Sequence, residues 1–194
     1  MAGNIALAIV VRGLAAMLHC PATSGTSAML ARMLIREADS SDWPAVWPFF
    51  HQIVAAGETF TYPVDLGKEE GRDWWLLSEP ARTVVAVDDT GTVLGMAKMN
   101  RNHMGNAGHI ASASFMAASA HEGRGAGRAL GEYTIEWARG AGFRAIQFNA
   151  VVETNVRAVS LYRSLGFDVL GTLPEGFHHP VHGYVGLHIM HRAL

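Results

Sequence analysis

The stretches HEGRGAGRAL, residues 121–130, and RAIQFNAVVETNVRAVSLYRSLGFDVLG, residues 144–171, decide how this chain folds. Three alternating glycines in the first stretch lie between an apolar strand and a helix-forming segment. A turn of this kind points backbone N–H groups at a helix N-terminus, where they bind phosphate oxygens. The dinucleotide-binding pattern GxGxxG fails because Leu130 replaces its third glycine, and no P-loop Gly-Lys-Ser/Thr follows. On these residues alone, a glycine turn that only reverses the chain stays equally open.

The second stretch predicts a strand over 144–150 and a helix over 155–165. Asn155 is placed to cap the helix, and Gly166 fits the left-handed position that ends one. Asn155 and Tyr162 are seven residues apart, so they share one helix face at a separation of about 10 Å. That spacing suits a long thin ligand held at two points. A capping asparagine and a core tyrosine without a ligand are the structural alternative.

In the rest of the chain, predicted strands and helices follow one another in a mixed order, and no internal repeat appears. Asp88 to Gly91 predicts a hairpin turn, Pro48 should kink or split its helix, and His178, His179 and His182 should lie in a Pro/Gly loop. The sequence predicts strands over 34–37, 83–87, 92–99, 109–118, 144–150, 167–172 and 184–192, and helices over 42–56, 67–78, 126–140 and 155–165. A hairpin followed by a βαβαβ run predicts an α/β or α+β fold with one parallel crossover.

Composition excludes several classes of function. The 194 residues carry a formal net charge of −2, so there is no basic footprint for a nucleic acid. No stretch reaches the ~18 clean apolar residues of a membrane span. The one cysteine, Cys20, excludes an intramolecular disulfide and a CxxC redox pair. His188 and His191 point to opposite faces of their strand, so we expect no metal site.

The first 32 residues differ from the rest of the chain. They hold no acidic residue, and Arg12 interrupts their longest apolar run, which no positively charged segment precedes. We expect residues 1–32 to be an extension, disordered or arising from a mis-assigned start, with a docked helix or a targeting signal as alternatives. Residues 33–194 read as the domain. We expect the protein to be cytoplasmic.

Taken together, the two stretches resemble the GNAT family of acetyl-CoA-dependent N-acetyltransferases. Glu122-x-x-Gly125-x-Gly127 matches the family motif Q/R-x-x-G-x-G/A, with Glu122 in place of Gln or Arg, and the Asn155 helix ends in Y-x-x-L-G-F. The resemblance covers residues 33–192. It implies a mixed, mainly antiparallel twisted sheet flanked by helices, with a central parallel pair of strands that splay apart.

The resemblance also implies roles for particular residues. Acetyl-CoA would be held by Gly123, Arg124, Gly125, Ala126, Gly127, Arg128 and Asn155. Tyr162 would be the general acid for the departing thiolate. The branch that includes azetidine-2-carboxylate (proline-analogue) acetyltransferases is similar around residues 147–155, and it implies that Asn149 acts in catalysis or cofactor positioning. Ser112 stands where that branch has a substrate-binding asparagine, which puts the proline-analogue specificity in doubt.

The chemistry requires a neutral amine, so a base or a chain of waters must remove a proton. Glu58, His109 and Glu153 are the candidate bases, and surface roles are the alternative for each. Glu58 and Phe60 lie in a loop that lines the acceptor site in this fold. We expect transfer of the acetyl group from acetyl-CoA directly to a small-molecule amine, an amino acid or analogue among them. A protein N-terminal or lysine acetyltransferase and a non-catalytic acyl-CoA sensor are the rivals, and a homodimer stays open.

Overall fold

The computed structural model describes residues 33–194, in which helices and strands follow one another much as the sequence predicts. The elements are β1 (Leu34–Glu37), α1 (Trp43–Ala56), α2 (Lys68–Trp75), β2 (Arg82–Val87), β3 (Val93–Arg101), β4 (Ile110–Ala117), α3 (Ala126–Gly140), β5 (Ala145–Val152), α4 (Val156–Ser164), β6 (Asp168–His179) and β7 (Gly183–Ala193). The 3-10 turns η1 (Gly105–Ala107) and η2 (Ser119–His121) flank β4. The predicted extension, residues 1–32, and Cys20 lie outside the described residues.

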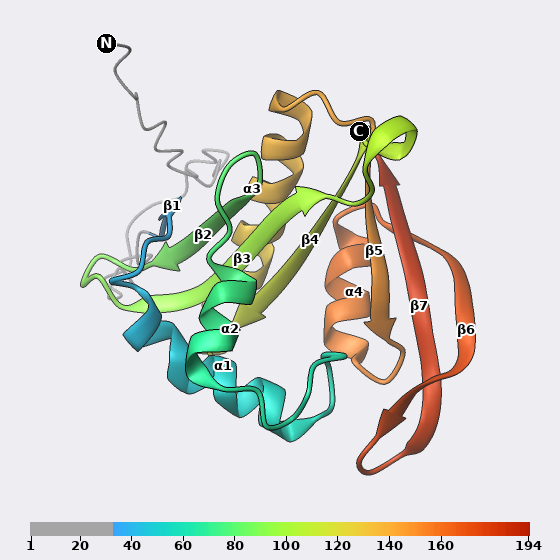
Figure 1. Cartoon of the computed structure of the whole chain (residues 1–194), viewed down its shortest axis with the longest axis horizontal. Coiled ribbons are helices and arrows are strands. Elements are labelled where there is room, and N and C mark those ends of the chain that lie inside the picture. Colours follow the sequence, from blue (N-terminus) through green and yellow to red (C-terminus); the bar gives the residue numbers. More distant parts are fainter. Residues whose placement is uncertain (1–32) are drawn as a thin grey trace, which may run out of the picture.

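One seven-stranded sheet organises the described residues in the order β1-β2-β3-β4-β5-β7-β6. The β4–β5 pair is parallel, and every other pair is antiparallel. Figure 1 shows the strands crossing the molecule, with β6 and β7 forming a long hairpin at one edge. This arrangement confirms the predicted fold class, including its central parallel pair.

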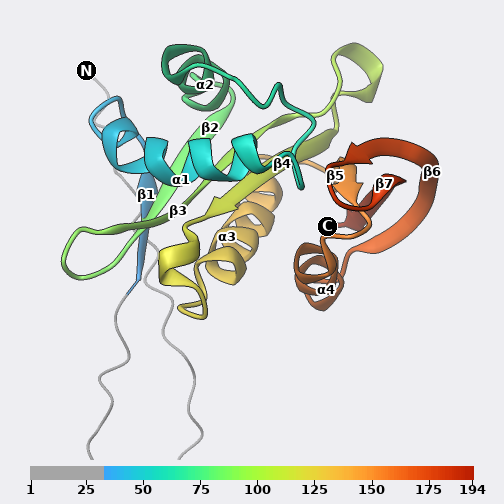
Figure 2. The same cartoon turned by 90° about the horizontal axis from the view of Figure 1, so that it is seen from below.

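The helices cover both faces of the sheet. Figure 2 shows α1 and α2 on one face and α3 and α4 on the other. Apolar side chains at helical spacing on α1, among them Val46, Phe50 and Val54, are buried against Trp75 and the strands. On the opposite face, α3 and α4 enclose a second core that includes Ile146 and Phe148 of β5. Both cores include a side chain of β4, whereas these two side chains of β5 belong to the second core.

The parallel pair is short, and this shortness creates the site. Only Ile110 with Ala145 and Ala111 with Ile146 stand in register before β4 and β5 diverge. Successive N–H groups of a strand point to alternate sides, so alternate N–H groups of β4 beyond Ala111 face the gap and not a partner strand. The gap therefore offers hydrogen-bond donors between two otherwise complete halves of the sheet.

Several boundaries differ from the sequence prediction. The strand predicted over 167–172 extends to His179, so His178 and His179 lie in β6 and not in a loop. Pro174 is tolerated because β6 is the edge strand, where a missing N–H costs no ladder bond, and the register with β7 shifts between Leu173 and Phe177. Pro48 lies inside α1 without splitting it.

The helix predicted over 67–78 ends at Trp75, because the next residue, Leu76, leaves the helical region. In the described part of the chain, no helix is long and apolar enough to cross a membrane.

Candidate active site

A cavity of about 230 Å³ opens where β4 and β5 diverge. One wall comes from the loop after α1, which contributes Thr59 to Tyr62. A second comes from Ser112 to Phe115 of β4. The remaining wall consists of residues 148–152 of β5 together with Asn155, Ala158 and Tyr162 at and on α4. The structure thus brings together five of the predicted site residues, Phe60, Ser112, Asn149, Asn155 and Tyr162.

Helix α4 presents Asn155 and Tyr162 to the cavity through strictly local structure. The Asn155 side chain accepts a hydrogen bond from the Ala158 N–H at 3.2 Å, which makes it the N-cap. At the other end, Gly166 adopts a left-handed conformation with φ 82°, and the Phe167 N–H donates to the Tyr162 carbonyl oxygen at 3.0 Å. Both predicted helix ends are confirmed, and they set the face that points into the cavity.

Aromatic rings hold the side chain of Tyr162. Its ring centroid lies 4.6 Å from that of Phe148 and 5.9 Å from that of Phe115, both of which also line the cavity. Burial raises the pKa of the Tyr162 phenol well above its ordinary value, because the surrounding rings cannot solvate a phenolate. Tyr162 therefore presents a neutral phenol, which can donate a hydrogen bond, to the cavity.

The glycine turn has the conformation that the sequence predicts. Gly123 and Gly125 lie in the left-handed region with φ 78° and 84°, and a Cβ added at either would meet nothing within 4 Å. Gly125 is the N-cap of α3, and no side chain in residues 33–194 caps this helix. The first backbone N–H groups of α3 therefore have no side-chain partner in this part of the chain, as an anion site at a helix N-terminus requires.

Charged residues around the turn are engaged with protein partners. The Arg124 guanidinium lies 2.9 Å from Asp88, in the turn between β2 and β3. Glu122, which departs from the family motif, pairs with Arg157 at the start of α4. Arg128 donates to the Ser164 hydroxyl at 2.7 Å. These contacts tie the turn to the β2–β3 hairpin and α3 to α4.

Asp88 is the most strongly stabilised carboxylate of this set. The Thr90 hydroxyl donates to it at 2.6 Å, the N–H groups of Thr90 and Thr92 each at 3.0 Å, and Arg124 completes the shell. The Thr90 hydroxyl first, and then the Thr92 N–H and Arg124, hold the pKa of Asp88 well below its usual range despite its burial. The Asp88 carboxylate therefore holds the guanidinium of Arg124, and with it the glycine turn, in place.

The part of the cavity between β4 and β5 is polar but uncharged. Ser112 and Ser114 alternate on one face of β4, and Asn149 emerges from β5 opposite them. None of the residues that line this cavity carries a formal charge. Ser114 and Tyr62 were not among the predicted site residues, although the period-two alternation of β4 pairs Ser114 with Ser112.

The three candidate bases all lie outside the cavity wall. Glu58 is exposed and directly precedes Thr59, which does line the cavity. His109 is also exposed, and its carbonyl oxygen accepts a hydrogen bond from the Arg144 N–H. Glu153 accepts a hydrogen bond from the Gly186 N–H at 2.6 Å, which ties the loop after β5 to β7.

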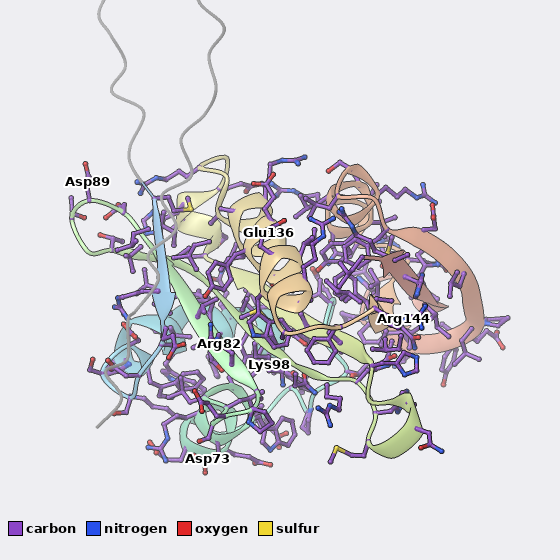
Figure 3. The ribbon with its side chains drawn as sticks, turned by 90° about the horizontal axis from the view of Figure 1, so that it is seen from above. Asp73, Arg82, Asp89, Lys98, Glu136 and Arg144 are labelled. Atoms are coloured by element: carbon purple, nitrogen blue, oxygen red, sulfur yellow. The ribbon has the colours of Figure 1, made fainter. Side chains whose placement is uncertain are left out.

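Lys98 lies beside the aromatic rings of Tyr62, which lines the cavity, and Trp75, which does not. Its ammonium donates to the Trp74 carbonyl oxygen at 3.0 Å and lies 5.6 Å from the ring centroid of Tyr62 and 5.2 Å from that of Trp75. Figure 3 shows it on the α2 side of the strands. In residues 33–194, no group of three or more His, Cys, Asp or Glu side chains is arranged to hold a metal ion.

Comparison with known proteins agrees with this geometry. Residues 45–167 match the model of the acetyltransferase (GNAT) family. A GCN5-related N-acetyltransferase from Kribbella flavida is 58% identical, with a TM-score of 0.81 over 84% of this chain and 98% of that chain. N-acetyltransferase aca1 of Schizosaccharomyces pombe is 24% identical over 156 residues, which are 73% of this chain and 75% of the relative.

A third comparison concerns a structure solved with its cofactor. The structure of yncA from Salmonella typhimurium, solved with its cofactor acetyl-CoA, has a TM-score of 0.73 at 22% identity over 84% of this chain and 94% of that chain. At this identity the likeness shows the shared fold. The family model and the closely similar Kribbella structure carry the assignment: the chain belongs to the GNAT family and is an acetyl-CoA-dependent N-acetyltransferase.

Proposed function

We propose that the protein acetylates the amine of a small molecule, an amino acid or analogue, by direct transfer from acetyl-CoA. The observation that carries this proposal is the cavity between β4 and β5, which is small and uncharged and is lined by both Tyr162 and Asn149. Ligand pockets commonly occupy about 300–1,000 Å³, and this cavity of about 230 Å³ must also take the thioester end of the cofactor, which favours a compact acceptor. Its lack of acidic residues gives a lysine-rich protein segment no electrostatic attraction.

The glycine turn is the proposed site for the cofactor diphosphate. The open N–H groups at the start of α3 would bind it, through the backbone of Gly123 to Arg128. Asn155 and Tyr162 would flank the pantetheine arm along α4, because both side chains line the same cavity. Arg124 and Arg128 would act mainly by fixing the turn, since their guanidinium groups already have protein partners.

Tyr162 is the proposed general acid. As the amine nitrogen bonds to the acetyl carbon, the carbon–sulfur bond breaks, and the phenol gives its proton to the departing sulfur. The rings of Phe148 and Phe115 fix the position of the phenol at the cavity wall, where it holds a proton that it can give to the sulfur. Unpaired N–H groups of β4 beyond Ala111 would stabilise the carbonyl oxygen while charge develops on it.

The proton of the attacking amine would leave through water. Glu58 is the proposed final acceptor, because it adjoins Thr59 of the cavity wall while its own side chain faces solvent. Residues 33–194 contain no cysteine, so a thioester on the enzyme has no site there. Ser112 and Phe60 would contact the acceptor. We propose a cytoplasmic location, and residues 33–194 as the catalytic domain.

A panel of acceptors tests the substrate class. Purified protein is incubated with acetyl-CoA and either free amino acids, proline analogues, or peptides bearing lysine or a free N-terminus, and thiol release is followed. We expect turnover with free amino acids or analogues, and little with peptides. Faster turnover of peptides would contradict the proposed class, and binding of acetyl-CoA without turnover of any amine would favour the sensor.

A further inference from the structure

Three carboxamide side chains meet at the edge of the cavity. Asn149 donates from Nδ2 to the Oδ1 of Asn102 at 2.6 Å, and its own Oδ1 accepts from Gln147 Nε2 at 2.8 Å. A longer contact of 3.4 Å joins Asn102 Nδ2 to the same oxygen of Asn149. Gln147 lies two residues before Asn149 on β5, whereas Asn102 follows the end of β3, 47 residues away. Two separate elements therefore fix one side chain.

The backbone at Asn149 explains why such support is needed. Phe148 pairs with Met190 and Val151 with His188, so β5 carries one extra residue against β7. This bulge leaves Asn149 and Ala150 exposed, and a bulge re-aims the side chains that it contains. Both residues line the cavity. Without partners, an exposed carboxamide at a bulge would sample several rotamers, and it would offer the cavity either its oxygen or its nitrogen.

The hydrogen bonds decide which atom Asn149 offers. A carboxamide has two N–H donors and an oxygen with two lone pairs. The oxygen of Asn149 already faces two donors, Gln147 Nε2 and Asn102 Nδ2, whereas Nδ2 uses one of its two hydrogens on Asn102. One N–H of Asn149 is therefore the unused group.

We propose that Asn102 and Gln147 are positioning residues that fix Asn149 as a hydrogen-bond donor toward an oxygen atom bound in the cavity. This inference rests on the proposed function. The oxygen belongs to either the acceptor, as a carboxylate or carbonyl, or the thioester. A carboxamide held in this way loses no rotational freedom when the ligand binds, which is the energetic benefit of preorganisation.

Substitutions at Asn102 test the proposal. Asn102→Ala removes the acceptor for the Asn149 N–H, and we expect kcat/KM to fall about five- to tenfold, the fold-change that one hydrogen bond contributes. Asn102→Asp keeps an oxygen at the same position and should restore most of the loss. Asn106→Ala, at an exposed asparagine of the same β3–β4 connection, is the matched control and should behave as wild type.

A double-mutant cycle separates positioning from general damage. If Asn102 acts through Asn149, the double variant Asn102→Ala/Asn149→Ala should be no slower than Asn149→Ala alone. Additive losses would overturn the proposal. A rise in KM for the acceptor alone identifies the acceptor oxygen as the ligand atom, and an equal fall in kcat for every acceptor identifies the thioester oxygen.

A readout without turnover keeps the inference separate from the proposed function. In the side-chain amide NMR spectrum, Asn149 should show one hydrogen-bonded, slowly exchanging N–H that is lost in Asn102→Ala and kept in Asn106→Ala. An Asn149 resonance that is unchanged by Asn102→Ala would overturn the positioning role, even in a fully active enzyme. Absence of turnover with every amine would instead refute the proposed function.

Discussion

Replacing Gly125 by alanine isolates the contribution of the glycine turn to cofactor binding. Gly125 has φ 84°, and a Cβ built on it meets no atom within 4 Å, so the substitution adds backbone strain without a steric clash. An L-residue in the left-handed region costs about 1–2 kcal/mol. The free turn relieves this strain by relaxing, and the bound cofactor must restore the original conformation. We therefore expect the Kd for acetyl-CoA to rise about 5- to 30-fold, the equivalent of that free energy.

Gly142→Ala is the matched control for this prediction. Gly142 has φ 78° and equally open surroundings, but it lies in the turn between α3 and β5, at the opposite end of α3 from Gly125. Calorimetric titration with acetyl-CoA should give wild-type affinity for Gly142→Ala, whose melting temperature should nevertheless fall by about 2–8 °C. Wild-type affinity in Gly125→Ala, or equal losses of affinity in both variants, would show that the conformation of the glycine turn does not control cofactor binding.

Three further predictions concern the reaction and its dependence on pH. Tyr162→Phe should lower kcat about 100-fold or more while leaving the Kd for acetyl-CoA unchanged, since a general acid contributes about 10²–10⁴ in rate; full activity would remove the assigned acid. Asp88→Asn should raise the KM for acetyl-CoA several-fold with kcat preserved, because it releases Arg124 of the glycine turn; an unchanged KM would show that this anchor has no effect. Because folding lowers the pKa of Asp88, its carboxylate stabilises the folded protein at pH values above the ordinary pKa of about 4, and this stabilisation is lost as the pH falls below that value. The melting temperature of Asp88→Asn should therefore fall less between neutral and acidic pH than that of wild type.

Local patterns predicted the parts of the site that depend on local structure. Asn155, Tyr162 and Gly166 belong to one helix and its ends, and helical spacing alone placed the first two on one face. The glycine turn was predictable for the same reason, because its conformation depends on consecutive residues. The central parallel pair of strands followed from the resemblance, and the register between β4 and β5 confirms it.

Contacts between distant residues could not be predicted in this way. The position of Arg124 in the glycine turn suggested that it lies near a phosphate. Its ion pair with Asp88 could not be predicted, because this contact depends on where the β2–β3 turn lies in the folded sheet. Likewise, nothing in the sequence joins Asn102 to Asn149, since their contact depends on the order of β3, β4 and β5 and on the bulge in β5. The expectation that His178 and His179 lie in a loop was wrong. Pro174 indicates the end of a strand, but an edge strand such as β6 tolerates a proline and continues to His179.

The stoichiometry of one reaction tests direct acetyl transfer most directly. Protein, acetyl-CoA labelled in the acetyl group and an accepted amine are mixed, and free thiol, acetylated amine and acetylated protein are quantified together. Direct transfer predicts equal amounts of free thiol and acetylated amine, with no label on the protein. Release of thiol without acetylated amine, or label that passes through the protein, would contradict direct transfer in the cavity between β4 and β5.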